Sequence, residues 1–266
     1  MNIIEHPENR LETLLRLAES EPAHRPEFCK RLLESNVFVL GEAEDDEGVG
    51  EFMEESSTVA LVSWQEGDGS ETIPFFSSLE TMQDSIEGDE NYVELPARVL
   101  FEMTLGSKLV LNPHSEYGKD FYPDEINSLL ASGILHESSQ QIIESEGEVL
   151  MGQPEENPSQ LIDSLTTLFS KHANVKAAYL ALIQDRDEGE EANLIIGIQG
   201  KGDLETVIQE AGLVAWDATE GNETIDFMVI EDDDDPISGY FLNECKPFYE
   251  GRWGTKLDSN VKPGEA

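Results

Sequence analysis

The sequence has few basic residues for its length. It holds 16 Lys and Arg against 57 Asp and Glu, which gives a formal net charge of −41 at pH 7. From Leu32 to Ala97 there is no Lys or Arg at all. Nucleic-acid phosphates and anionic lipid headgroups are repelled by such a surface. We therefore expect no nucleic-acid partner and no membrane partner.

Cysteine is also scarce, because Cys29 and Cys245 are the only two and lie far apart in the chain. Neither belongs to a CxxC pair or has a His placed beside it for zinc, so we expect free thiols in a reducing compartment. The N-terminus lacks the basic start and long apolar core of a secretion signal. No run approaches the roughly 20 apolar residues that cross a bilayer. These features favour a cytoplasmic location.

The sequence lacks the short motifs that carry common chemistries. There is no GxGxxG or GxxxxGK[ST] phosphate loop, no GxSxG elbow and no HExxH helix. The acidic runs at 185–191 and 231–235 lack the glycine and the final glutamate of a calcium loop and are typical of solvated turns. Weak cation binding there is the alternative. The five His are isolated in sequence, and His114 has no signalled partner to orient it as a base. We expect no catalytic residue, no metal site, no cofactor and no enzymatic activity.

The acidic excess itself has two interpretations. It can be a solvated coat that favours solubility, or a docking surface for a basic partner. The first is favoured, because charge usually determines solubility before it determines specificity.

A hydrophobic content of 38% over 266 residues is enough for real cores and suits two domains. Residues 1–151 alternate short helices and strands, with an exposed acidic loop at 42–55. The Pro- and polar-rich segment 152–159 predicts the linker. Residues 160–266 predict the order α-β-β-α-β-α. The expected fold class is α+β, with two mixed α/β domains, each a mostly antiparallel or mixed sheet with helices packed on it.

Several boundaries follow from capping and turn residues. Ser77 to Glu80 fits a capping box that opens a helix ending before Gly88. Gly212 predicts the end of a helix that begins at Asp203. The last helix is expected over Ile237–Tyr249, despite Pro247. Between them, Gln141–Glu144 and Glu148–Met151 are ambiguous but can be strands.

The segment 108–126 joins an apolar strand to a helix that starts at Pro123. Asn112 and Pro113 end the strand, because Pro lacks the backbone donor. Loops beyond strand ends are common ligand sites, so the loop 112–122 is a candidate site by position.

Aromatic residues suggest binding surfaces. Phe75 and Phe76 are adjacent in a strand, so one of them should point away from the core. Phe248, Tyr249 and Trp253 gather near Arg252, and such side chains dominate binding hot spots. The alternative is that this second group packs on its own sheet.

Five segments carry a resemblance: 21–35, 72–80, 95–113, 161–183 and 246–254. Among them, LPARVLFEMTLG and LIDSLTTLF are long and nearly uninterrupted. Together they resemble the bacterial enhanced-serine-sensitivity protein family, SseB, over nearly the whole chain. The resemblance implies a cytoplasmic protein with N- and C-terminal SseB domains. The family's name records a serine-sensitivity phenotype and no reaction.

These observations predict a non-enzymatic interaction or regulatory protein with a protein partner. The candidate interaction surface comprises Phe75, Phe76, Asn112, Pro113, Tyr117, Phe248, Tyr249, Arg252 and Trp253. The alternative is a sensor of an amino acid or related metabolite, or a weak enzyme, that uses the loop 112–122.

Overall fold

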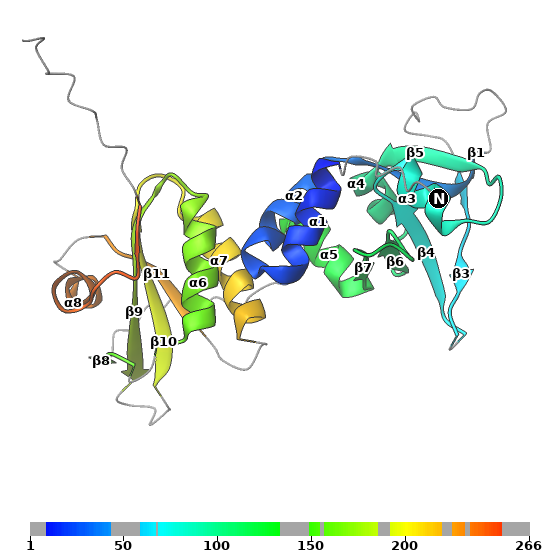
Figure 1. Ribbon diagram of the computed structural model, residues 1–266. Helices are drawn as coiled ribbons and strands as arrows, with labels where there is room; N and C mark the ends of the chain where they lie inside the picture. Colours follow the sequence, from blue (N-terminus) through cyan, green and yellow to red (C-terminus); the bar gives the residue numbers. More distant parts are fainter. Residues whose placement is uncertain are drawn as a thin grey trace, which may run out of the picture. The chain divides into compact units, whose positions relative to one another are not determined.

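The computed structural model describes residues 9–43, 59–67, 69–133, 149–154, 157–185, 192–219, 225–231 and 235–251. The chain divides into two compact units, Met1–Ser138 and Ser139–Ala266. Each has its own sheet and its own helices (Figure 1). The expected α+β fold class is confirmed.

The described elements of unit 1 are, in order, α1 (Arg10–Ser20), the 3₁₀ turn η1 (Pro22–His24), α2 (Arg25–Leu33), β1 (Asn36–Ala43), β2 (Val59–Leu61), β3 (Trp64–Gln65), β4 (Glu71–Phe76), α3 (Leu79–Ser85), β5 (Tyr92–Pro96), α4 (Ala97–Met103), β6 (Lys108–Leu111), β7 (Lys119–Phe121) and α5 (Pro123–Ser132). The strand order is β2-β1-β4-β6-β7, with β3 paired to β4 and β5 paired to β1. All pairs are antiparallel except β4 and β6, which are parallel.

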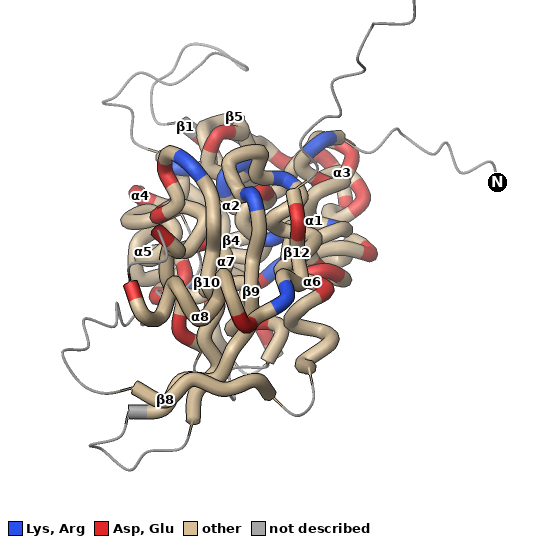
Figure 2. The backbone as a smooth tube through the Cα atoms, turned by 90° about the vertical axis from the view of Figure 1, so that its left-hand side faces the viewer, with Lys and Arg blue, Asp and Glu red and all other residues tan. Residues whose placement is uncertain are grey.

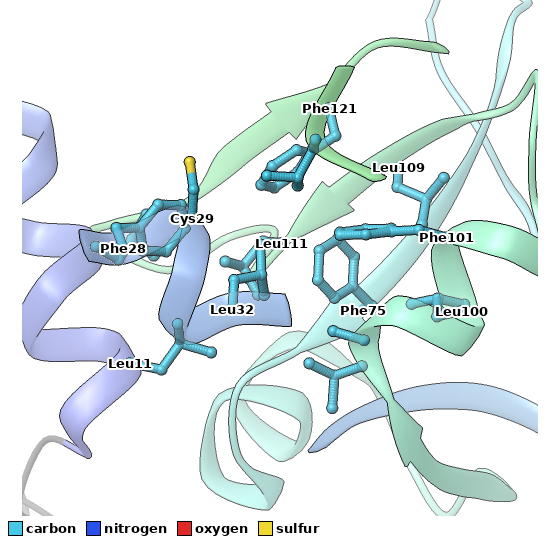
Figure 3. Packing of buried hydrophobic residues seen from close by; sticks show 14 of the residues in the cluster. Leu11, Phe28, Cys29, Leu32, Phe75, Leu100, Phe101, Leu109, Leu111 and Phe121 are labelled. Atoms are coloured by element: carbon cyan, nitrogen blue, oxygen red, sulfur yellow. The ribbon is translucent and has the colours of Figure 1, made fainter. Parts of the chain in front are cut away.

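The inner face of this sheet carries the main core of unit 1. Side chains alternate along a strand, so Val37 and Val39 of β1 point to this face. Helices α1, α2, α4 and α5 cover it, and three phenylalanine rings, those of Phe75, Phe101 and Phe121, pack together with centroids 5.6–5.9 Å apart (Figure 3). Burial of each large ring stabilises the unit by roughly 1.5–3 kcal/mol.

The outer face carries the alternate residues of the same strands and has a lighter cover. Leu40 and Phe76 are buried here beneath Met82 of α3. Ser78 caps α3 by accepting a hydrogen bond from the Thr81 N–H, 3.3 Å away. The expected box with Ser77 and Glu80 is thus one residue out of place, because the Ser77 side chain bonds elsewhere.

The described elements of unit 2 are β8 (Val149–Gly152), α6 (Ser159–Ser170), β9 (Val175–Asp185), β10 (Asn193–Gly200), α7 (Glu205–Ala218), β11 (Ile225–Val229), α8 (Pro236–Glu244) and β12 (Tyr249–Glu250). The strand order is β11-β10-β9-β12, with β8 also paired to β9. The pair β10–β11 is parallel and the others are antiparallel.

Helices cover both faces of the second sheet. Helices α6 and α7 lie on one face and α8 lies on the other (Figure 1). Phe241 of α8 is completely buried and packs against Tyr179 and Ile195 of the strands. Gly197 of β10 lies beneath Phe241, where an added Cβ would come within 2.9 Å of the ring. The central strands β9 and β10 are therefore buried on both faces along most of their length.

Four boundaries differ from those expected in the sequence. The helix α7 continues past Gly212, since burial of Val214, Ala215 and Ala218 outweighs the roughly 1 kcal/mol cost of an interior glycine. The helix α8 ends at Glu244, before Pro247, and the short strand β12 follows. The loop 112–122 contains β7, which pairs with β6.

The fourth difference concerns the division of the chain. It falls earlier than the expected linker 152–159, because β8 pairs with β9 and so belongs to unit 2. The ambiguous segment Glu148–Met151 is thus in part a strand, whereas Gln141–Glu144 lies outside the described residues, as does most of the acidic loop 42–55.

Within the described part of the chain, no helix is both long enough and apolar enough to cross a membrane. Acidic positions are spread over the elements and are not gathered in one place (Figure 2).

Candidate functional site

The parallel strands β4 and β6 end side by side, at the kind of position where ligands bind in open sheets. Ser77 follows β4 and Asn112 follows β6. The Ser77 N–H donates to Asn112 Oδ1 at 2.9 Å, and Asn112 Nδ2 donates back to Ser77 Oγ at 2.8 Å. The Asn112 N–H also bonds to the Phe75 carbonyl. Both the oxygen and the nitrogen of the Asn112 side-chain amide therefore bond to Ser77 and connect the ends of β4 and β6.

Glu12 of α1 joins this closure from the helix side. Its Oε1 accepts hydrogen bonds from Ser77 Oγ at 2.7 Å and Ser78 Oγ at 2.8 Å. It also accepts from Asn9 Nδ2 at 3.0 Å, while Oε2 accepts from the Asn9 N–H. We call Asn9, Glu12, Ser77, Ser78 and Asn112 the strand-end polar cluster. Its side chains hold α1, β4, α3 and β6 together by satisfying one another's hydrogen bonds.

The loop after β6 has an unusual backbone. Asn112 (φ 49°) and His114 (φ 67°) adopt left-handed conformations, which side chains other than glycine seldom do. Ser85 Oγ donates to the Pro113 carbonyl at 2.6 Å. A Cβ on Gly118 would lie 2.9 Å from the carbonyl oxygens of both Leu111 and Asn112. The loop is thus fixed by α3 on one side and by a close backbone approach on the other.

His114 contacts an aromatic side chain. Its exposed ring stacks on Trp64, with centroids 5.6 Å apart and planes 18° apart. Tyr117 lies half-buried against the inner core. The carboxylate of Glu116 raises the pKa of the Tyr117 phenol above its ordinary value. This makes Tyr117 a poorer acid near neutral pH.

Phe75 and Phe76 do not belong to an exposed surface. The alternation is as expected, with Phe75 on the inner face and Phe76 on the outer face, but both side chains are completely buried. The sequence could not show that α3 covers the outer face at this point. Asn112 is also buried and Pro113 is half-buried.

Phe248 and Tyr249 pack on their own unit. Both rings contact Phe169, with centroid distances of 6.2 and 5.8 Å. Tyr249 Oη donates to the Phe169 carbonyl near the end of α6, at 3.0 Å. Burial raises the pKa of the Tyr249 phenol. Arg252 and Trp253 lie outside the described residues.

Among the described residues there is no cluster of His, Cys, Asp and Glu that could hold a metal ion. Most of the acidic runs 185–191 and 231–235 fall outside the described ranges. Cys29 is buried in the core of unit 1, and burial raises the pKa of the Cys245 thiol, which disfavours the reactive thiolate.

The structure exposes large apolar side chains that sequence reasoning missed. Tyr122 is 54% exposed, Trp216 of α7 is 52% exposed and Tyr92 of β5 is 42% exposed. For Tyr92, strand alternation was an available signal, because Tyr92 lies three residues from Leu95 and so points to the opposite face of β5. Trp216 follows the apolar run Leu213–Ala215, so the sequence suggested that it is buried as well. Only the helix register shows that it lies on the exposed side of α7.

Comparison with known proteins gives a consistent result for both units. Residues 11–128 match the family model described as the SseB protein N-terminal domain, and residues 143–251 match the SseB protein C-terminal domain. The chain is 43% identical over 246 residues to Protein SseB of Escherichia coli (strain K12) and, equally, to Protein SseB of Shigella flexneri. These matches cover 92% of this chain and 93% of each relative. No solved structure matches.

Proposed function

Since the chain belongs to the SseB family and carries both of its domains, we propose that it is a non-enzymatic protein that acts by binding another protein. We place it in the cytoplasm. The phenotype recorded in the family's name suits a regulator that alters an enzyme of amino-acid metabolism through contact. The contrast between the strand-end polar cluster and the exposed rings supports this proposal.

In the strand-end polar cluster, the polar side chains form hydrogen bonds with one another. Glu12 accepts from two serines and an asparagine, and Asn112 pairs both ends of its amide with Ser77. A ligand entering here has to replace bonds that hold four elements together. Tyr122 and Trp216, in contrast, present large half-exposed rings, the type of side chain that dominates binding hot spots.

Capture from cytosolic extract tests the proposal. The immobilised full chain, at moderate salt, is compared with Trp216→Ala and with Met103→Ala, a control at an exposed residue of α4. We expect a protein that is enriched by the wild type and the control and reduced severalfold by Trp216→Ala. Recovery of no protein above background from the wild type would count against the proposal.

A second candidate function is a sensor of an amino acid or related metabolite at the loop 112–122. The two left-handed residues, Asn112 and His114, at the ends of parallel strands favour it, because strained backbone is common at functional sites. A thermal-shift screen against amino acids separates the two functions. Ligand at about 100 times its dissociation constant stabilises a protein by roughly 2.7 kcal/mol. A flat screen favours the interaction function.

A further inference from the structure

A row of aromatic rings crosses the outer face of the sheet in unit 1. The ring of Tyr92 on β5 contacts Phe38 on β1 edge-on, with centroids 6.0 Å apart. Phe38 is paired in register with Phe76 on β4. The ring of Phe76 contacts Trp64 at 6.4 Å, and Trp64 stacks on His114. We call Tyr92, Phe38, Phe76, Trp64 and His114 the outer aromatic row.

The cover over this row is incomplete. The helix α3, of seven residues, buries Phe76 and Leu40 at the centre. Both ends of the row reach solvent, because Tyr92 is 42% exposed and His114 is also exposed. Val62, beside Leu40, is exposed to the same extent as Tyr92. The inner face, by comparison, is covered by four helices.

The exposed charges beside Tyr92 and on α3 are negative. Glu94, two residues from Tyr92 on the same face of β5, is exposed, and so are Glu80 and Asp84 on α3. In the part of unit 1 that the structure describes, the Lys and Arg residues lie on α1, α2 and α4, which cover the inner face, and on β6 and β7.

Lys108 of β6 points to this face, because it alternates with the inward Leu109 and Leu111, but it is paired with two carboxylates. Its Nζ lies 2.8 Å from Glu66 and 2.9 Å from Asp120. These two carboxylates raise the pKa of Lys108, so it stays protonated and paired. Lys108 therefore does not offset the negative potential of the outer face.

From these contacts and charges we infer that the outer aromatic row is the docking surface for a protein segment rich in Lys and Arg with apolar residues between them. The inference rests on the proposed interaction function and supplies the chemistry of the partner. The partner's apolar side chains cover Tyr92 and Val62, and its cations lie over the aromatic faces and beside Glu94. An acidic segment is repelled by the same surface.

Fluorescence anisotropy with a labelled peptide in which Lys alternates with Leu tests the inference. The comparison peptide has Glu in place of each Lys. At roughly physiological salt, where charges more than about 8 Å apart are screened, we expect the full chain to bind the Lys peptide and not the Glu peptide. Tyr92→Ala should weaken binding about tenfold, and Glu94→Gln about threefold.

Each variant has a matched control on α4. Met103 is 44% exposed, close to the 42% of Tyr92, and Glu102 is an exposed glutamate like Glu94. Met103→Ala and Glu102→Gln should change binding by less than about twofold. Equal weakening by Glu102→Gln and Glu94→Gln would show attraction by net charge alone, and the inference would fail. Equal binding of both peptides would also overturn it.

Light scattering on the wild type and on Tyr92→Ala tests whether a second copy of the chain occupies this face. A dimer that Tyr92→Ala dissociates would show that a second copy occupies the face and would contradict the inference. The capture experiment distinguishes failure of this surface from failure of the proposed function. Capture of a protein that Trp216→Ala reduces and Tyr92→Ala leaves unchanged would retain the interaction function and reject this surface.

Discussion

Asn112 shows how one residue fixes both a backbone turn and a contact between strands. It adopts a left-handed conformation and gives both ends of its buried amide to Ser77. Asparagine tolerates this backbone better than other side chains that have a Cβ. The sequence predicted that the strand ends at this residue, but not the contact with Ser77, which is far away in the chain.

Asn112→Ala should lower the free energy of unfolding by about 3 kcal/mol, because it leaves the Ser77 groups unsatisfied and keeps the backbone strain. Asn112→Gly removes the same amide but relieves the strain, so its loss should be smaller by about 1 kcal/mol. Urea unfolding of both variants measures these differences. An unchanged midpoint for Asn112→Ala would contradict the structural role of this residue.

Asp226 on β11 should make the free energy of unfolding depend on pH. Its carboxyl is buried, and burial raises its pKa above the ordinary value of 3.8. The folded protein therefore holds this proton more tightly than the unfolded chain does. The stability that the group contributes is present at low pH and is lost as the pH rises through the folded pKa.

Asp226→Asn should then raise the free energy of unfolding at neutral pH, on the order of 1 kcal/mol. The gain should shrink as the pH falls toward 3.8, where the wild-type carboxyl is itself protonated. Urea midpoints measured across this range provide the test, with the exposed Asp163→Asn as control. A gain that grows toward low pH would show that the sign is wrong.

At the scale of elements, local patterns predicted most strands and helices, and long-range contacts set the rest. The adjacent Phe75 and Phe76 predicted that side chains of β4 point to two faces. That both faces are buried depends on where α3 lies, which no local pattern shows. In the same way, Gly212 indicated a helix end, but packing of α7 within unit 2 carries the helix through it.

Contact between β10 and α8 leaves no space above Gly197. An added Cβ would come within 2.8 Å of the Ile230 side chain and within 2.9 Å of the Phe241 ring. Gly197→Ala should therefore lower the free energy of unfolding by about 1–3 kcal/mol through overpacking. Gly152→Ala on β8 is the control, since its Cβ would meet no atom within 4 Å. Equal stability of the two variants would contradict the packing of α8 on the sheet.

At the scale of the whole molecule, the sequence predicted two α+β units, the acidic surface and the family. It placed the candidate site less well. Of the residues expected on an interaction surface, Phe75, Phe76 and Asn112 are buried, and Phe248 and Tyr249 pack on Phe169. Aromatic residues suit cores and interfaces equally, so the sequence alone does not separate these roles. Burial in the folded chain removes Phe75, Phe76 and Asn112 from the surface, and Tyr92, Tyr122 and Trp216 are the exposed rings that we propose in their place.

The central claim is that exposed rings, and not the chemistry of the loop 112–122, carry the function. One capture experiment with the full chain tests this directly, by comparing the wild type with Tyr117→Phe, Trp216→Ala and Tyr92→Ala. Tyr117→Phe removes the Tyr117 hydroxyl from the loop and keeps the ring, so we expect its partner recovery to equal that of the wild type. Trp216→Ala and Tyr92→Ala should each reduce recovery severalfold. Loss of the partner with Tyr117→Phe alone would contradict the account.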